Sequence, residues 1–303
     1  MHAPLPMKTE PGFTVSMPDW VGRLMAFRGS DAYRPAEAVA QSLRHLETND
    51  ATAAVGDIYQ PTIPLVTYEI APGIRKRLFF ELIAWTDAEM TVKLDELDRF
   101  LAVFSTDVPR RSFLPGISPH APQTVGRFLL EAACERAARH NMPVAIHLAE
   151  SPEEMQLLHD GSGSMVERLR LFDPHYDPAR VRLGRRPLDY LRFFESVGCF
   201  PVSIVHGNYL DDAEMRFLAD HADRFTLVHC PRCCAYFRFP VFPIRKLLGR
   251  GVRIALGTDS RASCPDLEIA HEADFLRQRH PWLDEETLHT MLTVNGSVAL
   301  GLA

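Results

Sequence analysis

Two histidines, a glutamate and an aspartate have the chemistry that metal-assisted hydrolysis needs. His147 and Asp259 offer nitrogen and oxygen ligands that suit Zn²⁺ or Fe²⁺, although an ion that activates water usually has at least three protein ligands. Glu150 follows His147 by three positions, so its carboxylate can carry protons between water and a leaving group. His206 can donate a hydrogen bond to the water or the substrate. Plain structural roles also fit: Glu150 as a first-turn carboxylate of a helix over residues 151–158, and His206 as a neutral buried imidazole.

The stretch VHCPRCCAYF, residues 228–237, places His229 close to Cys230, Cys233 and Cys234. A zinc or redox site at Cys230 and Cys233 is one interpretation. Zinc base deaminases carry H-x-E followed by P-C-x-x-C, but here the first pattern is one residue too long and the proline lies inside the second. A proline after the first cysteine is typical of a tight turn after a strand, and buried cysteine commonly behaves as a small hydrophobic residue. We therefore expect a strand end and its turn; fast-reacting thiols of low pKa in a titration would favour a redox site instead.

Short apolar runs rich in β-branched residues alternate with stretches of helical pattern along the whole chain. Apolar strands that alternate with helices predict a parallel sheet covered on its faces. The predicted strands span residues 52–58, 78–85, 112–118, 143–150, 202–209, 225–231 and 252–259. The main predicted helices span residues 36–48, 125–140, 188–198, 212–222 and 242–251. Residues 160–190 predict one long irregular insertion over one end of the sheet.

Polar side chains follow most of the predicted strands. They are Asp57, Glu81, His120, His147 with Glu150, His206, His229 and Asp259. In a (β/α)8 barrel, the carboxyl ends of the strands and the loops after them form the active site. Because the placement recurs at most strand ends, it favours one functional site over separate side chains that each only hydrogen-bond a carbonyl.

Composition limits the range of functions. The chain has 303 residues, of which 46% are hydrophobic, and this fits one large α/β domain. The net charge of −6 and the scattered lysines and arginines give no reason to expect nucleic acid or a membrane surface as a partner. Neither a transmembrane run nor a secretory signal is apparent, so the sequence predicts a cytoplasmic protein with reduced cysteines.

Five motifs occur in the order GISPHAPQTV, PVAIHLAESPEEMQLLHDGSGSM, SIVHGNYL, LVHCPRCCAYF and VRIALGTDSRAS. Together they resemble the amidohydrolase superfamily, and most closely its branch of chlorohydrolases and heterocycle deaminases. The resemblance extends from about Phe13 to Ala303. It implies a TIM-type (β/α)8 barrel that deaminates, or less often dechlorinates, a nitrogen heterocycle or aminopurine-like substrate with a metal-activated water. It also implies one divalent metal ion, Zn or Fe, and leaves a homodimer as an option.

The resemblance implies a role for each of the four residues introduced first. His147 on the family's fifth strand and Asp259 on its eighth would be metal ligands. Glu150 would move protons to the ring nitrogen and the leaving group. His206 would hydrogen-bond the attacking hydroxide or the substrate, and Asp259 would also accept the proton of the attacking water.

Three further residues are implied to contact the substrate. His120 would line the pocket, Trp20 would lie near its mouth, and His229 would sit at the end of a barrel strand near the same mouth. The substrate itself is not readable from these residues, because specificity depends on the geometry of the loops.

The sequence departs from the family at its first strand, which in relatives ends in His-x-His and supplies two metal ligands. His-x-His occurs nowhere in this sequence, and His2 stands alone. We expect a single barrel domain over residues 1–303 that lacks the first strand and the family's flanking β-sandwich. Three explanations are open: the chain is cropped or mis-started just before that strand, which we favour, it is a degenerate fragment, or it binds metal in another way.

Two consequences follow from the missing strand. Metal binding by the remaining ligands should be weak or absent, which stoichiometric Zn or Fe in chelator-free protein would contradict. A lost strand also removes about four or five apolar side chains worth roughly 1.5–3 kcal/mol each and leaves two unpaired edges, so another segment or subunit should fill the gap. A catalytically impaired or metal-free binding protein on this fold is the alternative function.

Overall fold

The structure is a computed structural model that describes residues 15–49, 52–104 and 113–303; His2 lies outside the described residues. The strands are β1 (Ala54–Tyr59), β2 (Arg75–Leu82), β3 (Phe113–Pro119), β4 (Val144–Leu148), β5 (Val202–His206), β6 (Phe225–His229) and β7 (Ile254–Leu256). The helices are α1 (Met17–Arg28), α2 (Pro35–Asn49), α3 (Asp87–Phe104), α4 (Arg127–Arg139), α5 (Pro152–Asp160), α6 (Ser164–Phe172), α7 (Pro178–Val181), α8 (Pro187–Val197), α9 (Asp212–Asp220), α10 (Pro231–Tyr236), α11 (Ile244–Gly249), α12 (Ile269–Arg279), α13 (Glu285–Leu292), α14 (Val294–Ala299) and the 3-10 helix η1 (Leu65–Glu69).

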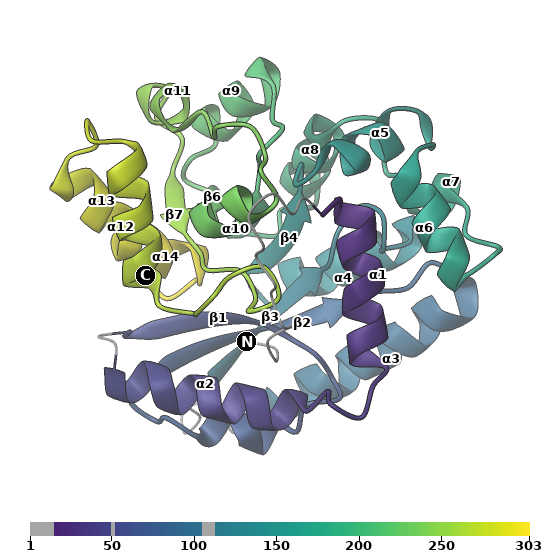
Figure 1. Cartoon of the computed structure of the whole chain (residues 1–303). Helices are drawn as coiled ribbons and strands as arrows, with labels where there is room; N and C mark the ends of the chain where they lie inside the picture. The colour runs from purple at the N-terminus through teal and green to yellow at the C-terminus, as the bar shows by residue number, and fades with distance from the viewer. Residues whose placement is uncertain (1–14, 50–51, 105–112) are drawn as a thin grey trace.

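The seven strands form one parallel sheet in the order β1-β2-β3-β4-β5-β6-β7, so each strand pairs with its neighbours in the chain. The sheet curls into a half-barrel with helices outside it, and Figure 1 shows α2 running along the outside of β1 and β2. The predicted TIM-type fold with one strand fewer is thereby confirmed for the described residues. Each predicted strand overlaps an observed one, although the last is shorter than expected.

Side chains alternate between the two faces of the sheet. On β4, Val144, Ile146 and Leu148 belong to the main hydrophobic core, whereas His147 lies between them on the opposite, inner face. The main core also contains leucines and phenylalanines of α3, α4 and α8. The outer face is therefore the packed one, and polar groups on the inner face are free to do chemistry.

The C-terminal segment links the two edges of the sheet. Asn295 of α14 donates to the Ile254 carbonyl of β7 at 2.8 Å, and Arg77 of β2 donates to the Leu300 carbonyl at 2.7 Å. Leu300 also packs so tightly on β1 that a Cβ at Gly56 would lie 2.5 Å from its side chain. The residues of α14 and those just after it thus contact both β1 and β7, the edge strands of the sheet in the described part of the chain.

Residues 160–190 are not the irregular insertion that the sequence predicted. They contain α6, α7 and the start of α8, because the spacing of Met165, Val166 and Leu169 gives α6 an apolar face. That face packs in a second hydrophobic cluster with residues of α1, α5 and α10, and Figure 1 shows α1 beside α6. Within the described residues, none of the helices is both long and apolar enough to span a bilayer.

Candidate active site

Three strand ends carry the site, and at each of them a residue other than glycine adopts a left-handed conformation. The φ angle is 55° at Ala149 after β4, 76° at His206 ending β5, and 59° at Asp259 after β7. Such conformations cost about 1–3 kcal/mol each and gather at functional sites. The strain therefore favours a functional role for this edge of the sheet.

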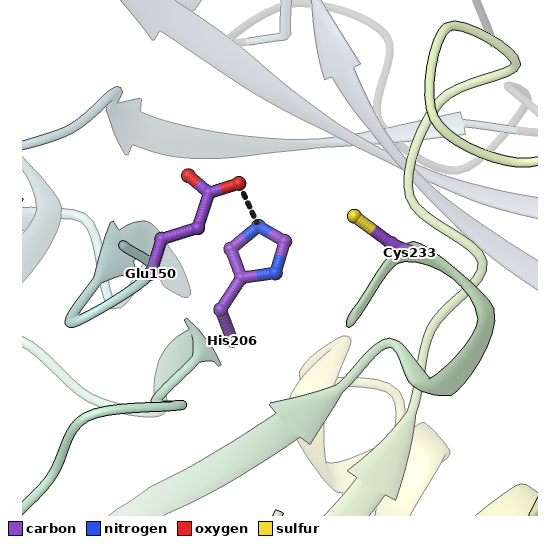
Figure 2. A group of neighbouring side chains, drawn as sticks. All are labelled: Glu150, His206 and Cys233. Carbon is purple, nitrogen blue, oxygen red and sulfur yellow. Dashed lines mark ion pairs between the residues drawn. The ribbon is translucent and has the colours of Figure 1, made fainter. Parts of the chain in front are cut away.

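Glu150 and His206 face each other at this edge (Figure 2). Glu150 Oε1 lies 3.4 Å from His206 Nε2, and their side chains are 15% and 3% exposed. Burial raises the pKa of Glu150 to about 7, and burial lowers the pKa of His206. A carboxyl group that exchanges its proton near neutral pH is suited to carry protons in catalysis.

Glu150 is not part of the helix that follows it. Ser151 is the N-cap of α5, and the first-turn carboxylates are Glu153 and Glu154. The alternative role of Glu150 as a first-turn carboxylate is therefore wrong. Its side chain is directed instead toward His206.

Glu154 holds the backbone that aims Glu150, and the sequence analysis missed it. Its Oε1 accepts the N–H of Ala149 at 2.7 Å, and its Oε2 accepts the N–H of Glu150 at 2.9 Å. The buried carboxyl group thus fixes the left-handed turn after β4. The Ser-x-x-Glu spacing of residues 151–154, which is typical of a capping box, was the signal that could have identified it.

His147 is held by a carbonyl on the neighbouring strand end. Its ring Nδ1 and its backbone N–H both lie 2.9 Å from the His120 carbonyl oxygen. A carbonyl only accepts hydrogen bonds, so Nδ1 carries the hydrogen and Nε2 of the neutral ring keeps a lone pair. This is the arrangement that orients metal-binding histidines. The ring centroid lies 5.0 Å from that of His120 and 5.5 Å from that of His206.

Asp259 is an ionised carboxylate with two side-chain donors. Burial alone would raise its pKa, but the nearby His206 and the hydrogen bonds from Cys233 and Ser263 bring the net pKa of Asp259 below its ordinary value. Cys233 Sγ lies 3.0 Å from Asp259 Oδ2, and the Ser263 hydroxyl donates to the same oxygen. An ionised carboxylate here can bind a cation or accept a proton.

The cysteine-rich stretch forms a strand end, as predicted, but a short helix begins where a turn was expected. β6 ends at His229, Cys230 is the N-cap residue, and Pro231 begins the short helix α10. All six cysteines of the chain are free and buried. Burial raises the pKa of both the Cys230 and the Cys233 thiols, which is opposite to the low pKa of a redox site. Nothing in the local sequence, however, indicates that Cys233 reaches Asp259.

Two of the strand-end polar residues lie outside this group. Asp57 of β1 is buried on the outer face, where the Tyr68 hydroxyl donates to it. His229 follows Phe225 and Leu227 on the packed face of β6 and stacks on Phe242 of the main core, with ring centroids 3.7 Å apart. The substrate contact predicted for His229 stays a prediction that its placement does not favour.

The burial of His229 predicts a pH dependence of stability. Burial lowers the pKa of His229 from 6.5 to about 3, so between these values the unfolded chain binds a proton that the native chain does not. The free energy of unfolding should therefore fall as the pH drops from about 6.5 to about 3. A His229→Phe variant keeps a ring against Phe242 and removes this proton, so urea unfolding should show a smaller loss of stability over the same range. An equal loss in the variant and the wild type would contradict the prediction.

Trp20 and His120 border the same edge. Trp20 of α1 donates from Nε1 to the Ala262 carbonyl at 3.0 Å and contacts Phe237 edge-on. His120 is held by a 2.7 Å hydrogen bond between its Nδ1 and the Thr124 hydroxyl oxygen. Trp20 thus connects α1 to the loop that follows Asp259.

The donor atoms that gather here suit a borderline divalent ion. Ligand atoms of Glu150, His206 and Cys233 all lie within 4.8 Å of one another. His147 presents Nε2 and Asp259 presents a carboxylate at the same edge, although these two are not part of that group of three. A mixture of imidazole, carboxylate and thiol fits Zn²⁺ or Fe²⁺ better than Mg²⁺ or Ca²⁺. The residues therefore fit a metal ion of the zinc or iron class.

Comparison with known proteins matches residues 68–303 to the model of the Amidohydrolase family. The chain is 30% identical over its whole length to the 5-methylthioadenosine/S-adenosylhomocysteine deaminase of Thermococcus onnurineus, and 29% identical over 81% of its length to that of Pyrococcus furiosus. It spans 68% and 55% of the lengths of these two relatives. The fold resembles that of aminofutalosine deaminase from Helicobacter pylori in complex with methylthio-coformycin, with a TM-score of 0.78, 16% identity and coverage of 97% of this chain and 70% of the other.

Proposed function

This chain belongs to the amidohydrolase family, and from that premise we propose that it hydrolytically deaminates an aminopurine nucleoside of the 5-methylthioadenosine class. The observation that carries the proposal is the buried Glu150–His206 pair, 3.4 Å apart, beside the ionised Asp259. The names of the two relatives support the substrate class. Removal of a halide from a heterocycle is the less favoured variant of the same reaction.

The proposed reaction replaces an amine on a ring carbon by oxygen. As water adds to the carbon, Glu150 takes one of its protons and passes it to the ring nitrogen. Asp259 accepts the other proton of the water, and Glu150 transfers this proton to the leaving amine. The carbon–nitrogen bond then breaks and ammonia departs. His206 donates a hydrogen bond to the attacking oxygen or the substrate. A pKa of about 7 for Glu150 supports its part, since such a group both takes up and gives up protons near neutral pH.

His147 and Asp259 are the residues that we propose to hold the divalent ion. Nε2 of His147 is available because its Nδ1 is bound to the His120 carbonyl, and Asp259 is ionised. When bound, a Zn²⁺ or Fe²⁺ ion would supply a hydroxide nucleophile near neutral pH, because it lowers the pKa of water. Two protein ligands are fewer than such ions usually have.

Trp20 and His120 are the proposed substrate contacts. Both lie at the edge that carries Glu150, which supports this role. His229, stacked on Phe242 at the packed face, has no comparable support. We also propose that residues 1–303 form a single barrel domain and that the chain forms a homodimer.

A metal-free binding protein is the second candidate function. The absence of His-x-His from the sequence favours it, because two metal ligands of the family are then missing.

Ammonia release from 5-methylthioadenosine and S-adenosylhomocysteine tests the two candidates. The chain is supplied with Zn²⁺ or Fe²⁺, and a purine riboside without the 6-amino group is the control. Ammonia from the amino compounds alone supports deamination. Saturable binding of both compounds without ammonia would overturn the proposal in favour of the binding protein.

A further inference from the structure

Three side chains at the carboxyl edge of the sheet form a compact group of metal-ligand types. One ligand atom each of Glu150, His206 and Cys233 lies within 4.8 Å of the other two (Figure 2). Among the residues that the structure describes, this is the one group of three or more such ligands, and neither His147 nor Asp259 is a member of it. The group therefore marks a place for a cation that is distinct from the one proposed at His147 and Asp259.

The Cys233 sulfur lies at the border between apolar packing and this polar group. Like Cys230, Cys233 is buried in the second hydrophobic cluster. Its thiol is directed toward Glu150 and His206 (Figure 2), and its Sγ lies 3.0 Å from Asp259 Oδ2. Apolar packing beside a ligand limits the access of water and lowers the local dielectric constant, which strengthens the attraction between ion and ligand. The cluster thus holds the sulfur in place and leaves it able to bind an ion.

The separations are close to those between ligands of one ion. In a tetrahedral zinc site with bonds of about 2.0–2.3 Å, two ligand atoms are roughly 3.3–3.6 Å apart. Glu150 Oε1 and His206 Nε2 are already 3.4 Å apart. The sulfur lies at most 4.8 Å from the other two ligand atoms, so rotations of the Glu150 and Cys233 side chains have to close a gap of about 1 Å at most.

The charges of the group balance those of a divalent ion. Glu150 supplies a carboxylate, Cys233 supplies a thiolate once it gives up its proton, and His206 is a neutral imidazole because burial lowers its pKa. An unbalanced charge is costly to bury, whereas two anionic ligands cancel the charge of Zn²⁺. Thiolate and imidazole favour zinc over Mg²⁺ or Mn²⁺. Three protein ligands also leave a fourth position for water.

We propose that Glu150, His206 and Cys233 bind a Zn²⁺ ion that inhibits the enzyme. On binding, the S–H bond of Cys233 breaks, its proton passes to solvent, and a sulfur–zinc bond replaces the hydrogen bond to Asp259. The ion occupies the carboxylate that moves protons in the proposed reaction and the imidazole that donates to the attacking oxygen. Neither group can then serve the reaction. The zinc site stands on its geometry, whereas the inhibition rests on the proposed function.

Titration of the metal-free chain with Co²⁺ tests the site without an activity assay. An ion bound to Cys233 should give the intense near-ultraviolet band of a cobalt–thiolate bond, and Zn²⁺ should displace it. Cys233→Ser should lose the band and bind Zn²⁺ at least about 10-fold more weakly, the smallest loss expected even for an outer-shell partner. Cys234→Ser alters the adjacent buried cysteine and, as the matched control, should keep the band and the affinity.

Two histidine variants show which group of ligands holds the ion. His206→Asn should weaken the binding of Co²⁺ and Zn²⁺ by at least about 10-fold, and asparagine tolerates the left-handed φ of 76° at this position. His147→Asn removes a strand-end histidine outside the group and should leave the band and the affinity unchanged. Glu150→Gln should also weaken binding, and because Glu150 lies before α5, this variant keeps the test valid if Cys233→Ser does not fold.

Three results would overturn the zinc site. They are a wild type without the band, a band that persists in Cys233→Ser, and a loss of affinity in His147→Asn as large as that in His206→Asn.

Ammonia release tests the inhibition. The chain is supplied with Fe²⁺, which such ligands bind less tightly than Zn²⁺, and Zn²⁺ is then added in steps. The wild type should lose activity as the group fills, and Cys233→Ser should need at least about 10-fold more Zn²⁺ for the same fractional loss. Equal sensitivity of the two proteins to Zn²⁺ would overturn the inhibitory role.

The zinc site and the proposed function fail in different ways. A wild type that releases ammonia and forms no cobalt–thiolate band would refute the zinc site and leave the deaminase intact. A wild type that forms a band dependent on Cys233 and His206, and releases no ammonia with Fe²⁺, would support the zinc site and refute the deaminase.

Discussion

Replacing Glu150 by glutamine is expected to lower the rate of deamination by about 10²–10⁴-fold, the usual contribution of a positioned acid or base. Glutamine has nearly the same shape as glutamate and can still hydrogen-bond His206, but its amide cannot carry protons. Because Glu150 lies before α5 and is held by backbone hydrogen bonds to Glu154, the variant should fold normally. The measurement is kcat for ammonia release, with circular dichroism as the check on folding.

Glu167→Gln is the matched control for Glu150→Gln. Glu167 lies in the first turn of α6 and is exposed to solvent. The same chemical change there should leave kcat unaltered. A Glu150→Gln variant that retains the wild-type kcat would exclude Glu150 as the group that moves protons.

Replacing Glu272 by alanine is expected to lower the free energy of unfolding by about 3–5 kcal/mol, because it leaves a buried arginine without its partner. Glu272 on α12 is fully buried and accepts hydrogen bonds from the Arg232 backbone at 2.9 Å and from its Nε at 2.7 Å. The Arg232 side chain is only 11% exposed. Asp266 also binds Arg232, at 2.6 Å, so the loss should fall at the lower end of this range.

Glu285→Ala is the control for this ion pair. Glu285 binds Arg277 at the surface, where the two side chains are 74% and 45% exposed, so its loss should change stability by at most about 1 kcal/mol. Urea unfolding of both variants gives the comparison. If Glu272→Ala costs no more than Glu285→Ala, the buried pair contributes little to stability.

The Arg232–Glu272 pair also affects the site. Arg232 directly precedes Cys233 in α10, and the pair joins this short helix to α12. Glu272→Ala should therefore lower kcat for ammonia release as well as the stability of the fold, because α10 carries Cys233 against Asp259.

The sequence by itself determined the seven strands and their parallel arrangement in one sheet. The alternation of apolar runs with helical stretches is a local pattern, set by residues close together in the chain, and it predicts a parallel sheet. The His147-x-x-Glu150 spacing and the histidine and aspartate at later strand ends were enough to place these groups at the carboxyl edge. The family resemblance came from the same local motifs.

Only the tertiary structure decided which face of the sheet each strand-end side chain occupies. His147 and His229 look alike in the sequence, each at the end of an apolar run, yet the first lies on the inner face and the second packs on Phe242. Residue type does not fix the register of a strand, and a shift by one residue reverses every side chain. The apolar face of α6 was likewise not recognised, because it gains a partner only when α1 packs beside it.

Cys233 shows most clearly that local sequence does not predict tertiary contacts. The sequence predicted a turn with a buried thiol, which is correct as far as local pattern reaches. Its contact with Asp259 joins residues 26 positions apart, and it exists because β6 and β7 pair in parallel and direct both loops to one edge. Local sequence sets the type of each donor, whereas the curled sheet sets which donors meet.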